Sequence, residues 1–72
     1  MEKDWMQVFN TSDRQRAWVV RAALESEGIK VVMLDKTSSP YTMVVTGELE
    51  LYVHVAQAEQ ALDIIYRVDE DN

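Results

Sequence analysis

The sequence contains no cysteine, and among its 72 residues there are only two glycines, one proline and one histidine. Without cysteine the chain by itself cannot form a disulfide framework, a thiolate zinc site or an iron–sulfur cluster. Residues 1–4 are followed by no continuous apolar segment, and no later run approaches the roughly 20 apolar residues that span a bilayer. We therefore expect a soluble, cytoplasmic protein without a signal peptide.

Basic residues are scarce in the second half of the chain. Residues 1–36 hold six basic and six acidic residues, whereas residues 37–72 hold seven acidic residues and only Arg67 as a base. The net charge of −6 therefore belongs to the second half. Because such a surface repels phosphates and anionic lipids, we expect neither nucleic acid nor a membrane among the partners.

The length predicts one domain, covering residues 1–72, with a core of about residues 5–66 and an acidic tail at 67–72. A chain of this size buries only about 60–65% of the surface that its unfolded form exposes. A large active-site cleft is therefore not expected.

The first half of the sequence predicts a strand followed by a helix. Residues 5–9 are rich in β-forming residues and are followed by polar ones. Ser12 and Gln15 have the spacing of a capping box, so we expect the helix to open at Ser12, with Asp13 in its first turn. Gly28 is expected to end the helix, because glycine readily adopts the left-handed conformation found just past helix ends.

The remaining elements are two strands and a helix. Residues 29–34 are apolar at nearly every position, and residues 48–55 alternate strictly between apolar and polar. This alternation places Leu49, Leu51, Val53 and Val55 on one face of the strand and Glu48, Glu50, Tyr52 and His54 on the other. A final helix is expected because Ala58, Ala61, Leu62 and Ile65 recur at helical spacing.

The order β-α-β-β-α predicts an α+β, ferredoxin-like fold that lacks its last strand. A right-handed crossover places both helices on one face of an antiparallel sheet, with the third strand between the first two. Two surfaces then remain uncovered, namely the outer edge of the first strand and the sheet face away from the helices.

The uncovered sheet face is the predicted interaction surface. Either alternate set of side chains in the first two strands leaves large apolar groups exposed there. The candidate interface residues are Trp5, Phe9, Val32, Leu34, Tyr52 and His54. Trp18 flanks the apolar stripe of the first helix, so we expect it in the core.

The stretch DKTSSPY, residues 35–41, has the composition of a turn. Residues 42–46 then read as extended chain, which forms either a short extra strand or a prolongation of the third. A hairpin needs only two to five loop residues, so this segment is long enough to act as a binding element. The ligand-loop candidates are Lys36, Ser38, Ser39 and Tyr41.

Catalytic groups are few. His54 is the only histidine, and one imidazole beside Glu50 does not supply the three or four ligands of a usual metal site. The spacing of the residues ties no nucleophile to His54. We expect no enzymatic activity, no cofactor and no bound metal.

Several short motifs resemble a small bacterial family labelled "putative signal-transducing proteins", an uncharacterised domain considered distantly similar to nitrogen-regulatory PII-type proteins. These motifs are Trp5-x-x-Val8-Phe9, Thr11-Ser12-Asp13, Ala17, Leu24-Glu25-x-x-Gly28-Ile29 and Gly47-Glu48-Leu49-Glu50-Leu51-Tyr52-Val53. The similarity covers about residues 5–66 and is carried mostly by structural positions. The PII-type analogy implies small-molecule or nucleotide sensing, but no glycine-rich phosphate loop is present to support it.

From the sequence we therefore expect a non-enzymatic regulatory or assembly domain that acts through its exposed sheet face and free edge strand, most simply as a homodimer. Its partner would be a second copy of the chain or another protein. The alternative is a PII-like small-molecule sensor in which residues 35–47 form the ligand loop.

Overall fold

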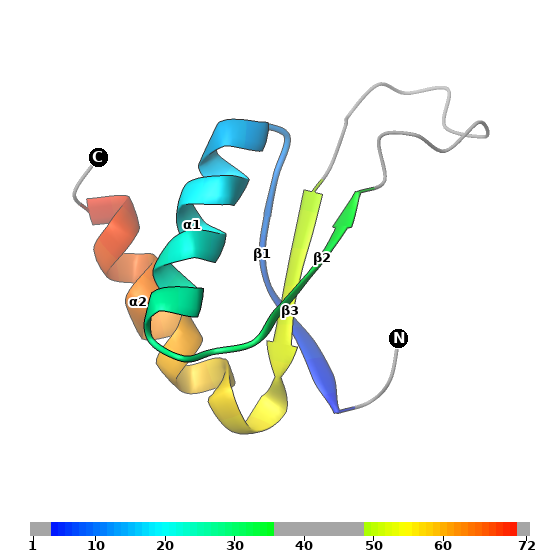
Figure 1. Cartoon of the computed structure of the whole chain (residues 1–72), viewed down its shortest axis with the longest axis vertical. Helices are drawn as coiled ribbons and strands as arrows, with labels where there is room; N and C mark the ends of the chain where they lie inside the picture. Colours follow the sequence, from blue (N-terminus) through cyan, green and yellow to red (C-terminus); the bar gives the residue numbers. More distant parts are fainter. Residues whose placement is uncertain (1–3, 36–48, 71–72) are drawn as a thin grey trace.

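The computed structural model describes residues 4–35 and 49–70 (Figure 1). The described chain forms a three-stranded antiparallel sheet with the strand order β1-β3-β2, so the strand that is last in sequence lies in the middle. The elements, in chain order, are β1 (Trp5–Thr11), α1 (Arg14–Ser26), β2 (Val31–Asp35), β3 (Leu49–His54), the 3-10 helix η1 (Val55–Gln57) and α2 (Ala58–Glu70). The predicted α+β, ferredoxin-like arrangement is confirmed.

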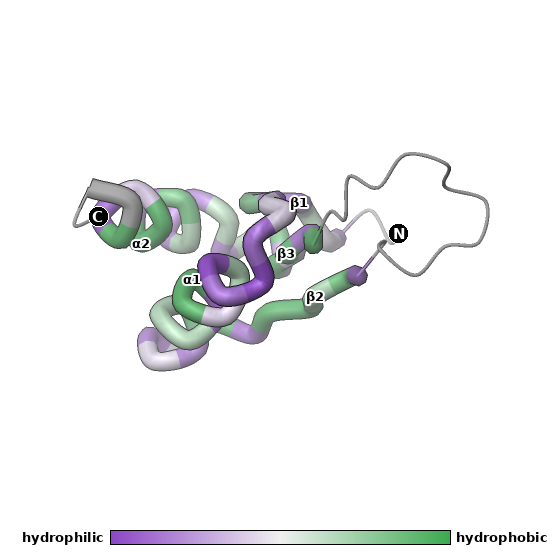
Figure 2. Tube along the Cα trace, turned by 90° about the horizontal axis from the view of Figure 1, so that it is seen from above, coloured by the Kyte–Doolittle hydropathy of each residue, from purple (hydrophilic) through white to green (hydrophobic). Residues whose placement is uncertain are grey.

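The molecule has two layers. Figure 2 shows both helices on the same side of the sheet, with α2 beside β1 and α1 toward β2. The space between the layers is filled by apolar side chains from both helices and from the helix-facing side of the strands. These buried residues are Val20, Leu24, Ile29, Val31, Leu51, Val53, Ala58, Ala61, Ile64 and Ile65.

The start of α1 differs from the prediction. Its N-cap is Asp13, whose Oδ1 accepts hydrogen bonds from the backbone N–H groups of Gln15 at 3.0 Å and Arg16 at 3.3 Å. Thr11 Oγ1 in turn accepts a hydrogen bond from the N–H of Asp13 at 3.0 Å. The predicted cap at Ser12 is wrong because the adjacent carboxylate satisfies the free N–H groups of the first turn instead.

The end of α1 is the predicted one. Gly28 has a φ of +82°, and its N–H donates to the carbonyl of Glu25 at 3.0 Å. The N–H of Ile29 donates to the carbonyl of Leu24 at 3.1 Å, which completes a Schellman motif. Because Leu24 and Ile29 are both buried, this turn also directs the chain from the helix into the core.

The strand β1 contains a β-bulge. Gln7 pairs with Tyr52 and Phe9 pairs with Leu51, so Val8 has no partner of its own in the ladder. In a bulge two consecutive residues oppose one residue of the neighbouring strand. Here both Val8 and Phe9 pack against the core.

The helix α2 begins through a short 3-10 turn. His54 Nδ1 accepts a hydrogen bond from the N–H of Ala56 at 3.0 Å and so caps η1, although the sequence at this point offers no carboxylate or hydroxyl cap. The helix then continues to Glu70, so most of the acidic segment expected as a tail from residue 67 is helical.

The observed cap gives a direct test of α1. Substituting Asp13 by Ala should lower the free energy of unfolding by about 1 kcal/mol, since it leaves two N–H groups of the first turn without their acceptor. For a domain of this size the melting temperature should fall by about 4–8 °C. Ser12→Ala is the matched control and should leave the melting temperature unchanged. If Ser12→Ala lowered the melting temperature and Asp13→Ala did not, Ser12 and not Asp13 would be the N-cap of α1.

Candidate functional site

The sheet face away from the helices has no element over it among the described residues (Figure 1). Side chains that are directly opposite in a strand pair lie on the same face, so the register assigns each residue to a side. We call this surface the open face. It consists of Trp5, Gln7 and Asn10 from β1, Val32 and Leu34 from β2, and Glu50, Tyr52 and His54 from β3.

The register places five of the six predicted interface residues on the open face. The exception is Phe9, which pairs with Leu51 and packs against the core on the helix side. The bulge at Val8 causes this difference, because it shifts the alternation of β1 by one residue. The sequence carries no glycine or proline within β1 that would mark the bulge.

A hydrogen-bond network occupies the centre of the open face. The hydroxyl of Tyr52 lies 2.9 Å from Glu50 Oε1, to which it donates, and 3.3 Å from Gln7 Oε1. Glu50 is 8% exposed, although its strand was expected to point it to solvent. The hydrogen bond to Glu50 is the main reason why the pKa of Tyr52 is raised above its ordinary value of 10.0, with burial and the charge of Glu50 adding to the effect.

An aromatic pair lies at the end of the same face. The rings of Trp5 and His54 meet edge to face with their centroids 6.1 Å apart. Since His54 Nδ1 accepts the N–H of Ala56, its proton is on Nε2, and the ring is held in one orientation by the start of η1. His54 therefore has a structural role in this arrangement.

The open face combines apolar side chains with a central polar network. Apolar Val32 and Leu34 on β2 and the Trp5 ring on β1 flank the polar network on β3. Within residues 4–35 and 49–70, no three His, Cys, Asp or Glu side chains gather into a set that would hold a metal ion. In the same part of the chain, neither helix has the length and apolarity that crossing a bilayer requires.

The outer edges of the sheet are also open to contact. The strand β3 is paired on both sides, whereas β1 and β2 are each paired on one side only within the described part of the chain. An edge strand presents a row of N–H and C=O groups that can pair with another strand. Among the described strands, none pairs with the outer edge of β1.

The position of Trp18 corrects a prediction. It is 52% exposed on α1, and the guanidinium of Arg21 lies 5.2 Å from the centre of its ring. The core face of α1 is taken by Ala17, Val20 and Leu24, so Trp18 falls outside that arc of the helix. Sequence reasoning also missed four further exposed apolar residues around β1 and α2: Met6, Val55, Leu62 and Tyr66.

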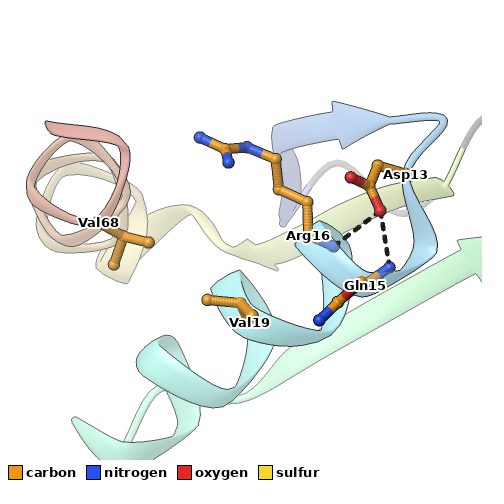
Figure 3. A pocket seen from close by; sticks show the side chains of 5 residues that line it. All are labelled: Asp13, Gln15, Arg16, Val19 and Val68. Carbon is orange, nitrogen blue, oxygen red and sulfur yellow. Dashed lines mark hydrogen bonds between the residues drawn. The ribbon is translucent and has the colours of Figure 1, made fainter. Parts of the chain in front are cut away.

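A shallow cavity of about 200 Å³ lies between the start of α1 and the end of α2 (Figure 3). It is lined by Asp13, Gln15, Arg16, Val19 and Val68. Two N–H groups at the start of α1, which would otherwise attract an anion, already donate to Asp13. The cavity is also smaller than the roughly 300–1,000 Å³ typical of small-molecule sites.

The ligand-loop candidates Lys36, Ser38, Ser39 and Tyr41 lie outside the described residues, as do residues 42–46. Among the described residues, the remaining candidates are those of the open face and the adjoining edge of β1.

A protein-family model described as "Putative prokaryotic signal transducing protein" matches residues 5–69. This match contains every described strand and nearly all of α2. No curated protein and no solved structure matches the chain.

The hydrogen bond between Tyr52 and Glu50 on the open face predicts that the free energy of unfolding depends on pH in the range where Tyr52 titrates. A tyrosine whose pKa is higher in the folded than in the unfolded chain adds stability that is fully present below the unfolded value and is lost as the pH rises through the folded value. Glu50→Gln removes the carboxylate charge and weakens the acceptor, so the pKa of Tyr52 should fall toward 10.0.

The measurement is the pH titration of the tyrosine ring-carbon signals by NMR, with Tyr66→Phe and Tyr41→Phe variants to assign them. An unchanged Tyr52 titration in Glu50→Gln would show that the hydrogen bond to Glu50 does not control this phenol.

Proposed function

The chain belongs to the family described as "putative prokaryotic signal transducing protein", and we propose that it is a non-enzymatic regulatory or assembly domain that works by self-association. The observation that carries the proposal is that, among residues 4–35 and 49–70, no element covers one face of the sheet or pairs with the outer edge of β1 beside that face (Figure 1). The partner is a second copy of the chain, most simply related by a two-fold axis.

The composition of the uncovered surface supports this proposal. Trp5, Val32 and Leu34 are only half-buried on the open face although they are large apolar side chains. Large apolar side chains that stay partly exposed on both sides of the polar network support an interface at this face. A standard interface takes about 800 Å² from each partner, which is roughly one sixth of the 5061 Å² surface of this chain.

The absence of enzymatic activity remains part of the proposal. The one histidine of the chain is engaged as the cap of η1, and the Glu50 carboxylate accepts the phenol of Tyr52. These contacts give both groups a part in the fold, which supports a structural role for them.

Self-association is expected in solution. Light scattering coupled to gel filtration should give twice the mass of one chain at high micromolar concentration, with dissociation on dilution. A mass of one chain throughout the concentration series would contradict the proposal.

A second candidate function is small-molecule sensing. It is favoured by the Trp5–His54 ring pair next to the phenol of Tyr52, since such groups can stack on a planar ligand and hydrogen-bond to it. A thermal-shift series with nucleotides and common metabolites tests it. A ligand at a hundred times its dissociation constant should stabilise the fold by about 2.7 kcal/mol.

The two tryptophans provide the matched controls for this series. Trp5→Leu should abolish the thermal shift, whereas Trp18→Leu, on the exposed side of α1, should preserve it. If no compound in the series raises the melting temperature, the sensor candidate is set aside and the assembly proposal is unaffected.

A further inference from the structure

The two outer edges of the sheet differ in charge. The edge strand β1 carries no charged residue from Trp5 to Thr11. The strand β2 ends at Asp35, which forms an ion pair with Arg14 of α1 at 3.1 Å. Each strand is also preceded by one charged residue, Asp4 before β1 and Lys30 before β2. Charged residues within a strand are a common protection of a sheet edge against pairing with another strand, and of the two edge strands β1 is the one without them, although it contains a bulge at Val8.

The helix above this edge also exposes apolar side chains. Leu62 and Tyr66 of α2 are 44% and 64% exposed. Val68 shares a cavity with Arg16 and Val19 of α1 and so marks the side of α2 that faces α1 (Figure 3). At 3.6 residues per turn, Leu62 and Tyr66 lie about 120° and 160° around the helix from Val68.

The flank that carries Leu62 and Tyr66 is the one next to β1. On the circumference of α2, the buried Ala58 and Ile65 lie between Val68 and Leu62. Going around α2 from the side that faces α1, one therefore passes the buried side that faces the sheet and then reaches Leu62 and Tyr66. Because α2 lies beside β1 in the helix layer, this flank borders the outer edge of β1 (Figure 2).

Two further exposed residues extend this surface. Val55 precedes Leu62 by seven residues, and its N–H donates to the carbonyl of Asp4 at 2.8 Å, which places it beside the start of β1. Met6 follows in β1 and pairs with Val53, so it is on the helix side of the strand. We call Met6, Val55, Leu62 and Tyr66 the edge patch; all four are exposed.

We propose that a second copy of the chain adds its β1 antiparallel to β1 of the first, and that the two edge patches meet across the same two-fold axis. This inference rests on the self-association proposed above and specifies where the second copy binds. The antiparallel pairing of a strand with its own copy is self-complementary, as a two-fold interface must be. The paired dimer has one six-stranded sheet, with the strand order β2-β3-β1-β1′-β3′-β2′.

The pairing joins the two open faces into one continuous surface and buries the uncharged edge of β1. It brings together an uncharged strand from each copy, while the ion pairs of α1 with β2 remain at the outer ends of the sheet. Adding a strand to an exposed edge is a recurring mode of recognition, in which main-chain hydrogen bonds give affinity and side-chain contacts give specificity.

The charges around the patch predict the salt dependence of this dimer. Glu59 and Asp63 lie on α2 near the patch, and each chain has a net charge of −6. Two such surfaces repel each other at low ionic strength, so the dimer should become tighter when salt is added. A contact between the arginine-bearing α1 of one copy and the acidic α2 of the next would instead weaken with salt.

Substitutions on exposed positions test the location of the interface. Leu62→Glu and Tyr66→Glu should each raise the dissociation constant of the dimer by at least about 30-fold, the effect expected for a central interface residue. Val19→Glu is the matched control, because Val19 is 47% exposed on α1 and lies outside the patch. Leu34→Glu on the open face should also leave the dimer intact, and circular dichroism checks that each variant is folded.

Cross-linking gives an independent test, because the chain has no cysteine. The variant Tyr66→Cys can form a disulfide only between two copies, and mild oxidation should convert most of it to a covalent dimer. Leu34→Cys is the control from the open face and should remain largely uncross-linked.

The outcomes separate this inference from the proposed function. If Leu34→Glu dissociates the dimer and Leu34→Cys cross-links while the α2 variants do neither, the edge interface is overturned and self-association through the open face stands. If the wild-type chain is monomeric at every concentration, both proposals fail. Salt that weakens the dimer would also overturn the edge interface.

Discussion

Leu51 and Val53 of β3 are fully buried in the core between the sheet and the two helices, and the rest of the structure depends on that contact. Leu49, which is also buried, lies on the same side of the strand. The strand is the only one of the described strands with a neighbour on both sides, so its alternation sets the face of every residue paired to it. Once these three side chains face the helices, Glu50, Tyr52 and His54 must face the other way. Two helices cover one face of this narrow sheet, and no element of the described residues covers the other face.

The parts of the fold that could be predicted from the sequence are those with a strong local signal. Gly28 ends α1 because no other residue type adopts its backbone conformation as easily, and the alternation of β3 separates its two faces. The parts that could not be predicted depend on competition or on tertiary context. Asp13 displaces Ser12 as the N-cap, since both residues have suitable side chains and only the backbone geometry decides between them.

The candidate site shows the same division. Trp5, Val32, Leu34, Tyr52 and His54 could be placed on a common surface as one of two alternate sets, but Phe9 could not be separated from them. A bulge one residue long reverses the face of everything beyond it, and β1 gives no composition signal for it. The exposed flank of α2 was missed because Leu62 fits the apolar stripe in sequence, while in the structure it is 44% exposed.

Within the described residues, the sheet is open along the outer edge of β1 and on the face away from the helices. The uncharged edge of β1 and the exposed patch beside it lie on one side of the molecule, and the family to which the chain belongs is named for signal transduction. A dimer formed at that edge would present two open faces as one surface. Assembly would then control how much of this surface is available for a regulatory contact.

The most direct measurement is amide hydrogen exchange along the two edge strands as a function of protein concentration. Exchange of an outward N–H slows when it becomes hydrogen-bonded to a second chain. Dimerisation through β1 predicts that the amides of β1 become more protected from exchange as the protein concentration rises, while the protection of the β2 amides does not change. Equal and concentration-independent exchange at both edges would contradict it.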